Sequence, residues 1–427
     1  MKLDKSQALL ERARAVIPSA TQTFSKGPNQ WVRGVSPAYL ERGEGAWVWD
    51  ADGNKYLDYL MALGPVILGY GDKVVNGAIQ DQLERGQVFS QMHPLEVEVA
   101  EKLVQLIPCA EMVRFAKNGS DATTGAIRAA RAYTKRDHIV YCGYHGWHDW
   151  YIGTTTRNAG VPKAVQELSH SFTYNDVASL KAVFDAHPKD IAAVIMEPVG
   201  VEMPDEGFLE TVRDLAHENG SLLIFDEIIN GFRLAFGGSQ EMLGVTPDLA
   251  TFGKAMANGM PLSAVVGRRE VMEIFDEIFF SGTFGGDAVA LAACKATIDE
   301  MEKRDVIAHI REYGKKLNDG IRTMIEQYAL KDAIGLVGFE ARSILSFPND
   351  DEALSRLRRS YFMQECHKRG LLFFGAHLPT DAHGEEELAF TLKVYSEVFP
   401  LFAAAYQGND FADRMEGEVV EPIFRKP

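Results

Sequence analysis

The chain has 427 residues, of which 46% are hydrophobic and 24% are charged, the composition of an ordinary globular protein. Its 44 basic and 60 acidic side chains give a net charge of −16, and no run of Lys or Arg offers a binding surface to nucleic acid or to an anionic membrane. The four cysteines are scattered singly, which argues against a disulfide framework or a zinc cluster and indicates reduced thiols, as in a cytoplasmic protein.

The first 60 residues predict a helix, a polar arm and a small antiparallel sheet. Residues 1–19 are charged and amphipathic and lack the apolar core of a signal peptide. Residues 38–60 contain short aromatic runs divided by Gly-Glu-Gly and Asp-Gly turns, which is typical of a β-meander. No apolar run in the chain approaches the ~18 residues of a membrane span, so we expect no membrane association.

From about Pro94 the pattern changes to helices that alternate with short apolar strands. Near-continuous apolar runs between helices predict an α/β fold, with a mostly parallel central sheet covered by helices on both faces. The candidate strands cover 112–116, 138–142, 192–198, 221–227 and 263–268.

The remaining chain predicts a smaller α+β domain. From about Lys303 a charged helix is followed by two strands within 333–348 and by two further helices. We therefore expect three parts: an N-terminal segment that joins the small domain, a large domain and a C-terminal small domain, at 1–60, 61–302 and 303–427.

One lysine, Lys254, lies in an apolar, glycine-punctuated segment at 249–267. A lysine held away from water is more often uncharged and able to attack a carbonyl, so Lys254 is a candidate Schiff-base lysine. The competing interpretation is a side chain that extends to solvent from the end of a helix. Asp226 favours the first interpretation, although it could also cap the next helix. It ends an apolar strand, where a protonated pyridine nitrogen, as in pyridoxal phosphate (PLP), would be a suitable partner for its carboxylate.

Asn118, Gly119 and Ser120 open a periodic helix with a glycine turn. Such a turn presents backbone N–H groups and the positive end of the helix dipole to an anion, which makes these residues candidates for binding a phosphate. The same residues also form an ordinary helix cap. A second turn of hydroxyls and glycines, with Ser281 and Thr283, precedes a later helix and is equally ambiguous.

The loop after the strand at 138–142 contains Tyr144, His145 and His148. An aromatic side chain at this edge of the sheet could stack on a cofactor ring. His145, His148 and Asp149 could instead suggest a metal, but this spacing without a further His or Cys nearby is poor, and we predict no metal. The chain also lacks the H-E-x-x-H, P-loop, G-x-G-x-x-G and G-x-S-x-G motifs, which argues against the commonest competing chemistries.

Taken in order, these motifs resemble the class III, fold-type I aminotransferases, and the nearest branch is that of the glutamate-1-semialdehyde 2,1-aminomutases. The resemblance runs from about Leu9 to Val289 and weakens beyond Ala290. It rests on Asn118-Gly119-Ser120-Asp121, Tyr144-His145-Gly146, Glu197-Pro198, Asp226-Glu227, Lys254 and Gly282-Thr283.

The resemblance implies PLP as the cofactor and assigns two catalytic residues. Lys254 would form the Schiff base and then act as the base that moves the proton. Asp226 would hold the ring nitrogen. Ile228 would pack on one face of the ring, opposite Tyr144.

The resemblance also implies how the phosphate is held. Asn118, Gly119, Ser120 and Glu197 are expected near the cofactor, and Gly119 and Ser120 would bind its phosphate. Thr283 would reach this phosphate from a second subunit. We therefore expect a homodimer whose active sites lie at the interface.

Several positions depart from the aminomutase pattern. Residues 150–167 are shorter than the Gly/Ser/Pro-rich lid of the aminomutases, and a lid governs the retention and release of intermediates. Lys26 stands where the family has an arginine that grips the substrate carboxylate, and a lysine cannot bind it in a bidentate fork. Leu63 replaces a tryptophan, and Asp121 replaces a glutamate.

These departures favour transfer between two molecules. We expect an aminotransferase with an amino-acid donor, glutamate, and an aldehyde or keto acceptor. His377 and His383 predict a polar mouth that suits a sugar-acid aldehyde as the acceptor, by analogy with sugar aminotransferases. The candidate substrate contacts are Lys26, His145 and His377.

Three alternatives stay open. The first is intramolecular amino transfer by a glutamate-1-semialdehyde 2,1-aminomutase, which would need no external amino donor. The second is a PLP-binding protein without turnover, against which Lys254 and Asp226 argue. The third is decarboxylation or racemisation, because PLP chemistry depends on which substrate bond the site aligns.

Overall fold

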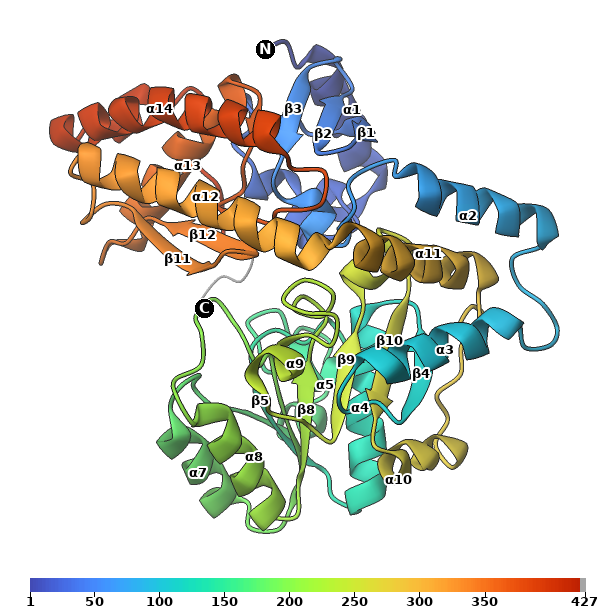
Figure 1. Cartoon of the computed structure of the whole chain (residues 1–427). Helices are drawn as coiled ribbons and strands as arrows, with labels where there is room; N and C mark the ends of the chain where they lie inside the picture. Colours follow the sequence, from blue (N-terminus) through green and yellow to red (C-terminus); the bar gives the residue numbers. More distant parts are fainter. Residues whose placement is uncertain (423–427) are drawn as a thin grey trace. The chain divides into compact units, whose positions relative to one another are not determined.

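The computed structural model describes residues 1–422, which divide into two compact units. Within the described chain, unit 1 contains residues 1–63, 68–72 and 308–422, and unit 2 contains residues 64–67 and 73–307. The N-terminal segment therefore folds together with the C-terminal part of the chain, and the intervening residues form a unit of their own (Figure 1).

Unit 2 is built on a seven-stranded sheet with the order β4-β10-β9-β8-β7-β5-β6. Strand β10 is antiparallel to both of its neighbours, and the other adjacent pairs are parallel, so six strands run one way and β10 runs the other. The five expected strands are confirmed, and β6 and β9 are added to them. The strands are β4 (Met112–Ala116), β5 (His138–Cys142), β6 (Ser169–Ser171), β7 (Ile191–Met196), β8 (Leu222–Asp226), β9 (Leu249–Phe252) and β10 (Ser263–Gly267).

Both faces of this sheet are covered, as the continuous apolar strands predict. Every residue of β7, β8, β9 and β10 is buried, and successive residues of a strand point to opposite faces. One face carries Ile195, Ile224 and Val265, which share a hydrophobic cluster with the alanines of α4 (Gly119–Thr134). The other helices of unit 2 include α2 (Lys73–Arg85), α3 (Pro94–Leu106), α5 (Asp149–Ile152), α6 (Lys163–Gln166), α7 (Val177–Ala186), α8 (Phe208–Glu218), α9 (Ser239–Leu243), the 3₁₀ turn η5 (Lys254–Ala257), α10 (Arg269–Met272) and α11 (Ala288–Arg304).

Unit 1 contains two small sheets and several long helices. The expected meander is confirmed as β1 (Leu40–Glu44), β2 (Trp47–Asp50) and β3 (Lys55–Asp58), and β3 pairs in parallel with β13 (Leu371–Leu372). A second sheet is antiparallel and consists of β11 (Gly335–Phe339), β12 (Arg342–Ser346) and β14 (Ala376–His377). The helices include α1 (Asp4–Val16), α12 (Val306–Gln327), α13 (Glu352–Lys368), α14 (Glu385–Gly408) and α15 (Phe411–Arg414).

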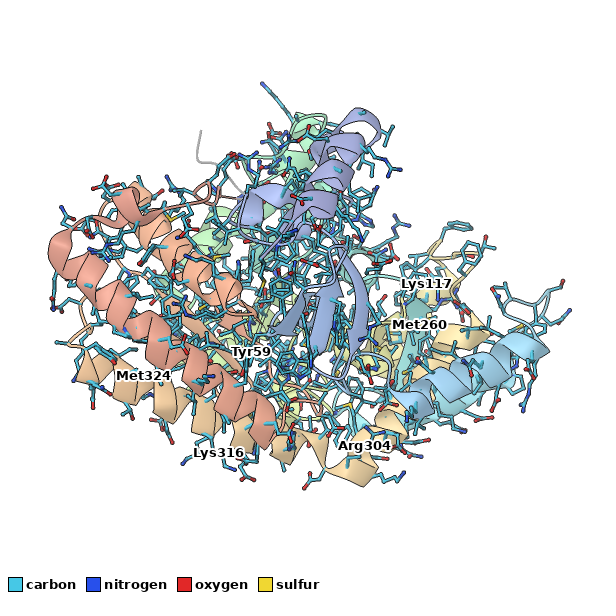
Figure 2. All side chains as sticks on the ribbon, turned by 90° about the horizontal axis from the view of Figure 1, so that it is seen from above. Tyr59, Lys117, Met260, Arg304, Lys316 and Met324 are labelled. Carbon is cyan, nitrogen blue, oxygen red and sulfur yellow. The ribbon has the colours of Figure 1, made fainter. Side chains whose placement is uncertain are left out.

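The core of unit 1 is rich in aromatic side chains whose polar atoms are paired. Tyr59, labelled in Figure 2, is fully buried, and its hydroxyl lies 2.5 Å from the Tyr313 hydroxyl and 2.8 Å from Thr391 Oγ1. Burial raises the pKa of Tyr59 and of Tyr313, so both phenols stay neutral. Hydrogen bonds between buried hydroxyls avoid the cost of leaving such groups unsatisfied.

Helix α14 is, among the described helices, the one long and apolar enough to cross a membrane. Half of the residues in its most apolar stretch are buried in the fold, as in the core helix of a large domain. Length and composition alone are therefore weak support for a membrane span.

Candidate active site

The polar residues that follow the strands of unit 2 meet at one edge of its sheet. Asn118 comes shortly after β4, Tyr144 after β5, Glu197 directly after β7, and Lys254 after β9, while Asp226 is the last residue of β8. All five strands run in the same direction, so their carboxyl ends lie at the same edge. Ligands of open α/β sheets bind at this edge.

Asp226 is a buried carboxylate held by several donors. It is 4% exposed, and its Oδ1 accepts hydrogen bonds from the Ile228 backbone N–H at 3.1 Å and from Thr251 Oγ1 at 3.3 Å. Its Oδ2 lies 2.8 Å from His145 Nδ1. An ionised carboxylate has about four acceptor positions, so one of them can still accept from a ligand N–H.

His145 is placed differently from the expectation, which made it a substrate contact. It is 2% exposed, and its Nε2 lies 3.0 Å from the Cys142 carbonyl oxygen. His145 is thus paired with Asp226 inside the fold, with its second ring nitrogen against a backbone carbonyl, and its role is to hold the carboxyl group of Asp226 in place.

Glu227 shows how strongly this edge is desolvated. It is fully buried, and burial raises its pKa to about 7, against hydrogen bonds from the Ser239 and Gln240 backbone N–H groups that lower it. Glu227 therefore fixes the turn that follows Asp226 through its two backbone hydrogen bonds.

Helix α4 begins with a complete capping box. Asn118 Oδ1 accepts from the Asp121 backbone N–H at 3.2 Å, and Asp121 Oδ2 accepts from the Asn118 backbone N–H at 3.1 Å. The shorter acid at 121 thus still completes the cap. The first turn of this 16-residue helix, with Gly119 and Ser120, presents the positive end of the helix dipole at the same edge.

The loop after β5 is tied to the first turn of α4. Ser120 Oγ accepts from the Trp147 backbone N–H at 3.2 Å, and Thr123 Oγ1 donates to the His145 carbonyl at 2.9 Å. Gly146 makes this approach possible, because its φ is +106° and a Cβ there would lie 2.3 Å from Ser120 Oγ. Such a contact is far shorter than side chains tolerate.

Ile228 packs closely against two glycines at this edge. A Cβ at Gly119 would come within 3.3 Å of Ile228, and one at Gly253 within 3.2 Å. Lys254 follows directly, is half-buried, and has a φ of +44°. Left-handed backbone at a residue other than glycine costs on the order of 1–3 kcal/mol and is concentrated at functional sites.

Tyr144 and Glu197 are the two remaining candidate residues at this edge of the sheet. Glu197 Oε1 accepts from the Tyr144 backbone N–H at 3.3 Å. The Tyr144 ring is 53% exposed and makes an edge contact with Tyr151. Partial burial, with a contribution from the charge of Asp226, raises the pKa of Tyr144, so the ring remains a neutral stacking surface.

Thr283 lies beside the start of α4, because the cavity that it lines is also lined by Asp121. It is exposed in the segment before α11 and lines a cavity of about 390 Å³ with Lys117, Thr124 and His148. Its expected contact with a phosphate of a second subunit stays a prediction. His148, whose Nδ1 lies 2.8 Å from Thr124 Oγ1, belongs to no cluster of metal-ligating side chains in the described part of the chain.

Two of the expected substrate residues belong to unit 1. Lys26 is exposed and lines a cavity of about 290 Å³ with Trp31, Asp58 and Tyr70. Its contact with a substrate carboxylate stays a prediction.

His377 corrects the sequence prediction of a polar, histidine-bearing mouth. It is fully buried, with its ring nitrogens 2.6 Å from the Tyr395 hydroxyl and 3.2 Å from Ser343 Oγ. Burial lowers its pKa to about 3, so it is a neutral core side chain. His383 is also fully buried and stacks on Tyr59.

Sequence reasoning missed one functional residue, Thr251. It is fully buried in β9, paired in register with Asp226, and supports that carboxylate through its hydroxyl. The available signal was a hydroxyl within an apolar strand directly before the candidate lysine.

Comparisons with known proteins show the family to which this chain belongs. A model of the class III aminotransferases matches residues 30–380. A 3-aminobutyryl-CoA aminotransferase of Cloacimonas acidaminovorans is 36% identical over 415 residues, which cover 93% of this chain and 97% of that protein. A glutamate-1-semialdehyde 2,1-aminomutase of Thermus thermophilus is 36% identical over 426 residues, covering 92% and 98%. The solved structure of FumI from Sphingopyxis sp. MTA144, in a form that contains PLP, has a TM-score of 0.88 at 30% identity and covers 98% and 99%. The expected resemblance is thus confirmed, and the chain belongs to the class III aminotransferases, PLP-dependent enzymes of fold type I.

Proposed function

We propose that this enzyme transfers an amino group between two molecules, from an amino-acid donor, glutamate, to an aldehyde or keto acceptor. The observation that carries the proposal is the segment between α5 and α6, where the aminomutase pattern has a long lid. It is short and hydrogen-bonded to itself: Asn158 Nδ2 donates to the Gly153 carbonyl at 3.3 Å, and Gln166 Nε2 donates to the Val161 carbonyl at 2.8 Å. A short, closed segment favours product release between half-reactions.

PLP fits the residues at the sheet edge. Asp226 retains acceptor capacity for a ring N–H, Ile228 packs beside Gly119 and Gly253 at the same edge, and the first turn of α4 offers an anion site at Gly119 and Ser120. When bound, PLP supplies an electron sink for the carbanion that forms at the substrate carbon.

The chain's own residues supply orientation and proton transfer. His145 holds the carboxyl group of Asp226 where a protonated ring nitrogen would need it. Lys254 Nζ would provide the amine that holds the cofactor and would then accept and return the proton of the substrate carbon. Tyr144 would offer its ring as a stacking surface beside the bound cofactor.

The proposed class of acceptor rests on the reactions for which the relatives are named. It no longer rests on the predicted polar mouth with His377 and His383. Because His377 and His383 are buried, the argument for a sugar-acid aldehyde loses its support. The name of the Cloacimonas relative places the reacting amino group on the third carbon of an acyl chain. The class to test first is therefore an acceptor whose carbonyl carbon is not the neighbour of the carboxyl group but lies further along the chain.

A homodimer is the proposed assembly, because unit 2 exposes several large apolar side chains. Phe279 is 81% exposed, Phe284 59%, Met92 79% and Val97 60%. Phenylalanine and methionine side chains are enriched at protein interfaces. A mixture of Lys254→Ala and Thr283→Ala chains tests the proposed sharing, because a mixed dimer would then hold one site without either substitution and regain activity.

The aminomutase reaction is the second candidate, since relatives that match 92% and 94% of this chain carry that name. To separate the two candidates, single amino compounds are added to the enzyme and the visible absorption of its cofactor is followed. In a second assay, ¹⁵N from labelled glutamate is traced into the product. Label in the product is the expected result. Isomerisation of glutamate 1-semialdehyde without any donor would instead establish the aminomutase.

Lys254→Ala tests the catalytic assignment in the same assay. It should abolish turnover and the borohydride-stable attachment of PLP. Lys295→Ala is the matched control, because Lys295 lies on α11 and pairs with Glu98 outside the site. Turnover by Lys254→Ala at the rate of the control would refute the assignment.

A further inference from the structure

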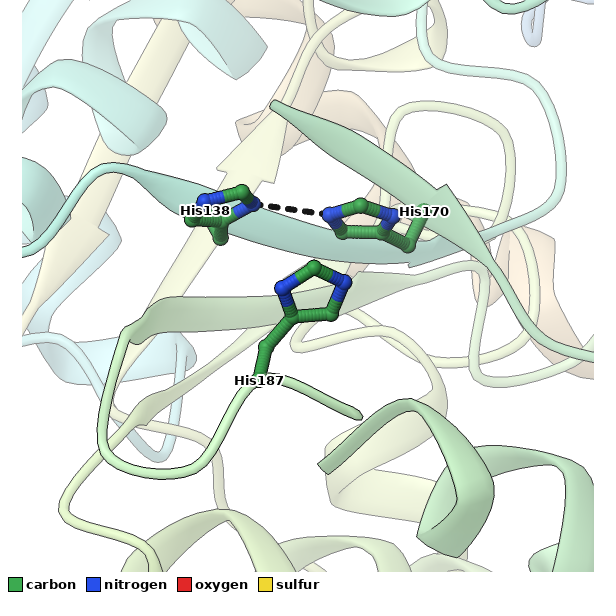
Figure 3. A group of neighbouring side chains, drawn as sticks. All are labelled: His138, His170 and His187. Atoms are coloured by element: carbon green, nitrogen blue, oxygen red, sulfur yellow. Dashed lines mark hydrogen bonds between the residues drawn. The ribbon is translucent and has the colours of Figure 1, made fainter. Parts of the chain in front are cut away.

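Three histidines that the amino-transfer chemistry does not use lie together in unit 2 (Figure 3). His138 is the first residue of β5, His170 lies on β6, and His187 follows the end of α7. One ring nitrogen of each lies within 4.8 Å of the others, and all three side chains are half-buried. Among the described residues, this is the group of His, Cys, Asp or Glu side chains whose geometry suits a metal ion.

The backbone holds the three rings in place. His138 and Val140 point to the same face of β5, and Val140 is paired with His170 on the edge strand β6, so His138 and His170 are diagonal neighbours. The backbone N–H of His138 donates to the Asp190 carbonyl at 3.3 Å, and that of Asp190 donates to the His187 carbonyl at 3.3 Å. The loop with His187 is thus fastened to the start of β5.

The contacts of His138 match those of a metal-ligating histidine. Its Nδ1 lies 2.8 Å from His170 Nε2, and its Nε2 lies 3.4 Å from Asp190 Oδ2. A carboxylate behind the distal nitrogen orients an imidazole and raises its basicity, as in carboxylate–histidine–zinc groups.

The separations are close to those that a metal requires. Zn–N bonds of about 2.05 Å in a tetrahedral site place two nitrogens about 3.3 Å apart. The three nitrogens all lie within 4.8 Å of one another, so their separations exceed this value by at most about 1.5 Å, which small rotations of the rings can close. The cluster also borders an open hollow of about 680 Å³ with Tyr141, Asn158 and Gln166, which gives a cation access and leaves a position for water.

We propose that His138, His170 and His187 bind one divalent first-row transition-metal ion, such as Zn²⁺, through three imidazole nitrogens, with water in the fourth position. Three neutral nitrogen ligands suit zinc, copper and nickel and are poor for magnesium or calcium.

This metal would be structural, because it lies away from the active site. His138 begins β5, whereas Tyr144 and His145 follow its other end, about 13 Å away for a strand of this length. The ion would join the edge strand β6 and the α7–β7 loop to β5. It would therefore stabilise the edge of the sheet without contacting the cofactor.

The test is zinc binding by the PLP-loaded enzyme after chelation and dialysis. Bound zinc is measured by mass spectrometry at defined free Zn²⁺, and Co²⁺ is used in parallel for the visible absorption of a tetrahedral nitrogen site. We expect about one equivalent of zinc per chain, and a rise in Tm with Zn²⁺, because an ion that binds only the folded state stabilises it.

His170→Gln and His187→Gln should each weaken zinc binding at least ~10-fold and remove the rise in Tm. His187 lies outside the strands, so its variant should fold even if the His170 variant does not. His217→Gln is the matched control, because His217 contacts Asp248 outside the cluster. No saturable zinc binding by the wild type, or equal binding by both cluster variants and the control, would overturn the proposal.

Discussion

Replacing His145 with phenylalanine isolates the buried ion pair that holds Asp226. A phenyl ring keeps the contacts with Trp150 and Tyr151, at centroid distances of 6.1 and 5.6 Å, and removes both N–H donors. Removing one partner of a buried ion pair costs about 3–5 kcal/mol, because the other charge stays buried. Asp226 keeps its bonds from the Ile228 backbone and Thr251, so we expect about 3 kcal/mol, the lower end of this range.

For a unit of this size, about 3 kcal/mol corresponds to a fall in Tm of roughly 6–12 °C. PLP affinity and kcat/KM should fall as well, because Asp226 loses the side chain that holds its Oδ2 in position to accept from a ring N–H. Thermal unfolding with and without PLP, together with steady-state kinetics, measures both effects.

His148→Phe is the matched control. It is the same substitution three residues along the chain, and it removes a hydrogen bond to Thr124 that does not involve Asp226. That loss should cost about 1 kcal/mol. A double-mutant cycle of His145→Phe with Asp226→Asn then gives the coupling energy of the pair. Additive effects, or equal stabilities of the two phenylalanine variants, would refute the ion pair.

Three further predictions concern the same unit. Burial raises the pKa of Glu227 from 4.5 to about 7, so the folded state binds this proton more tightly than the unfolded chain does. The free energy of unfolding should therefore fall by roughly 3 kcal/mol as the pH rises from 4.5 to about 7. Glu227→Gln should flatten this part of the profile in denaturant titrations at several pH values; an unchanged slope contradicts the assignment. Gly146→Ala should lower Tm and PLP affinity, because its Cβ would meet Ser120 Oγ, whereas Gly160→Ala, with φ +90° and no atom within 4 Å, should cost only backbone strain of about 1 kcal/mol. Burial raises the pKa of the Cys142 thiol to about 11, so a thiol reagent at pH 8 should label it in guanidinium and not in the native enzyme; rapid native labelling would show that the site is open.

The local pattern of residues was enough to predict most of the large unit and the composition of its site. Continuous apolar runs such as 222–225 predict strands buried on both faces. In such a strand the side chains of both faces pack against helices, so polar residues are disfavoured at every position. Residues placed directly after such strands, Asp226 and Glu197 among them, then share one edge for geometric reasons alone.

Which side chains contact one another was decided by packing. His145 and His377 were both expected to face a substrate, yet one is paired with Asp226 and the other is buried against Tyr395. A histidine's polarity does not reveal on which side of a strand or loop it will lie, because a shift of one residue turns it from solvent to core.

The three-histidine cluster shows the same limit most clearly. His138, His170 and His187 come from three segments with irregular spacing, so no sequence motif predicts that they form a cluster. They meet because β6 pairs in parallel beside β5 and the α7–β7 loop returns to the start of that strand. Periodicity and turn chemistry act over a few residues and set the strands and helices, whereas the crossovers that bring distant segments together depend on how those elements pack.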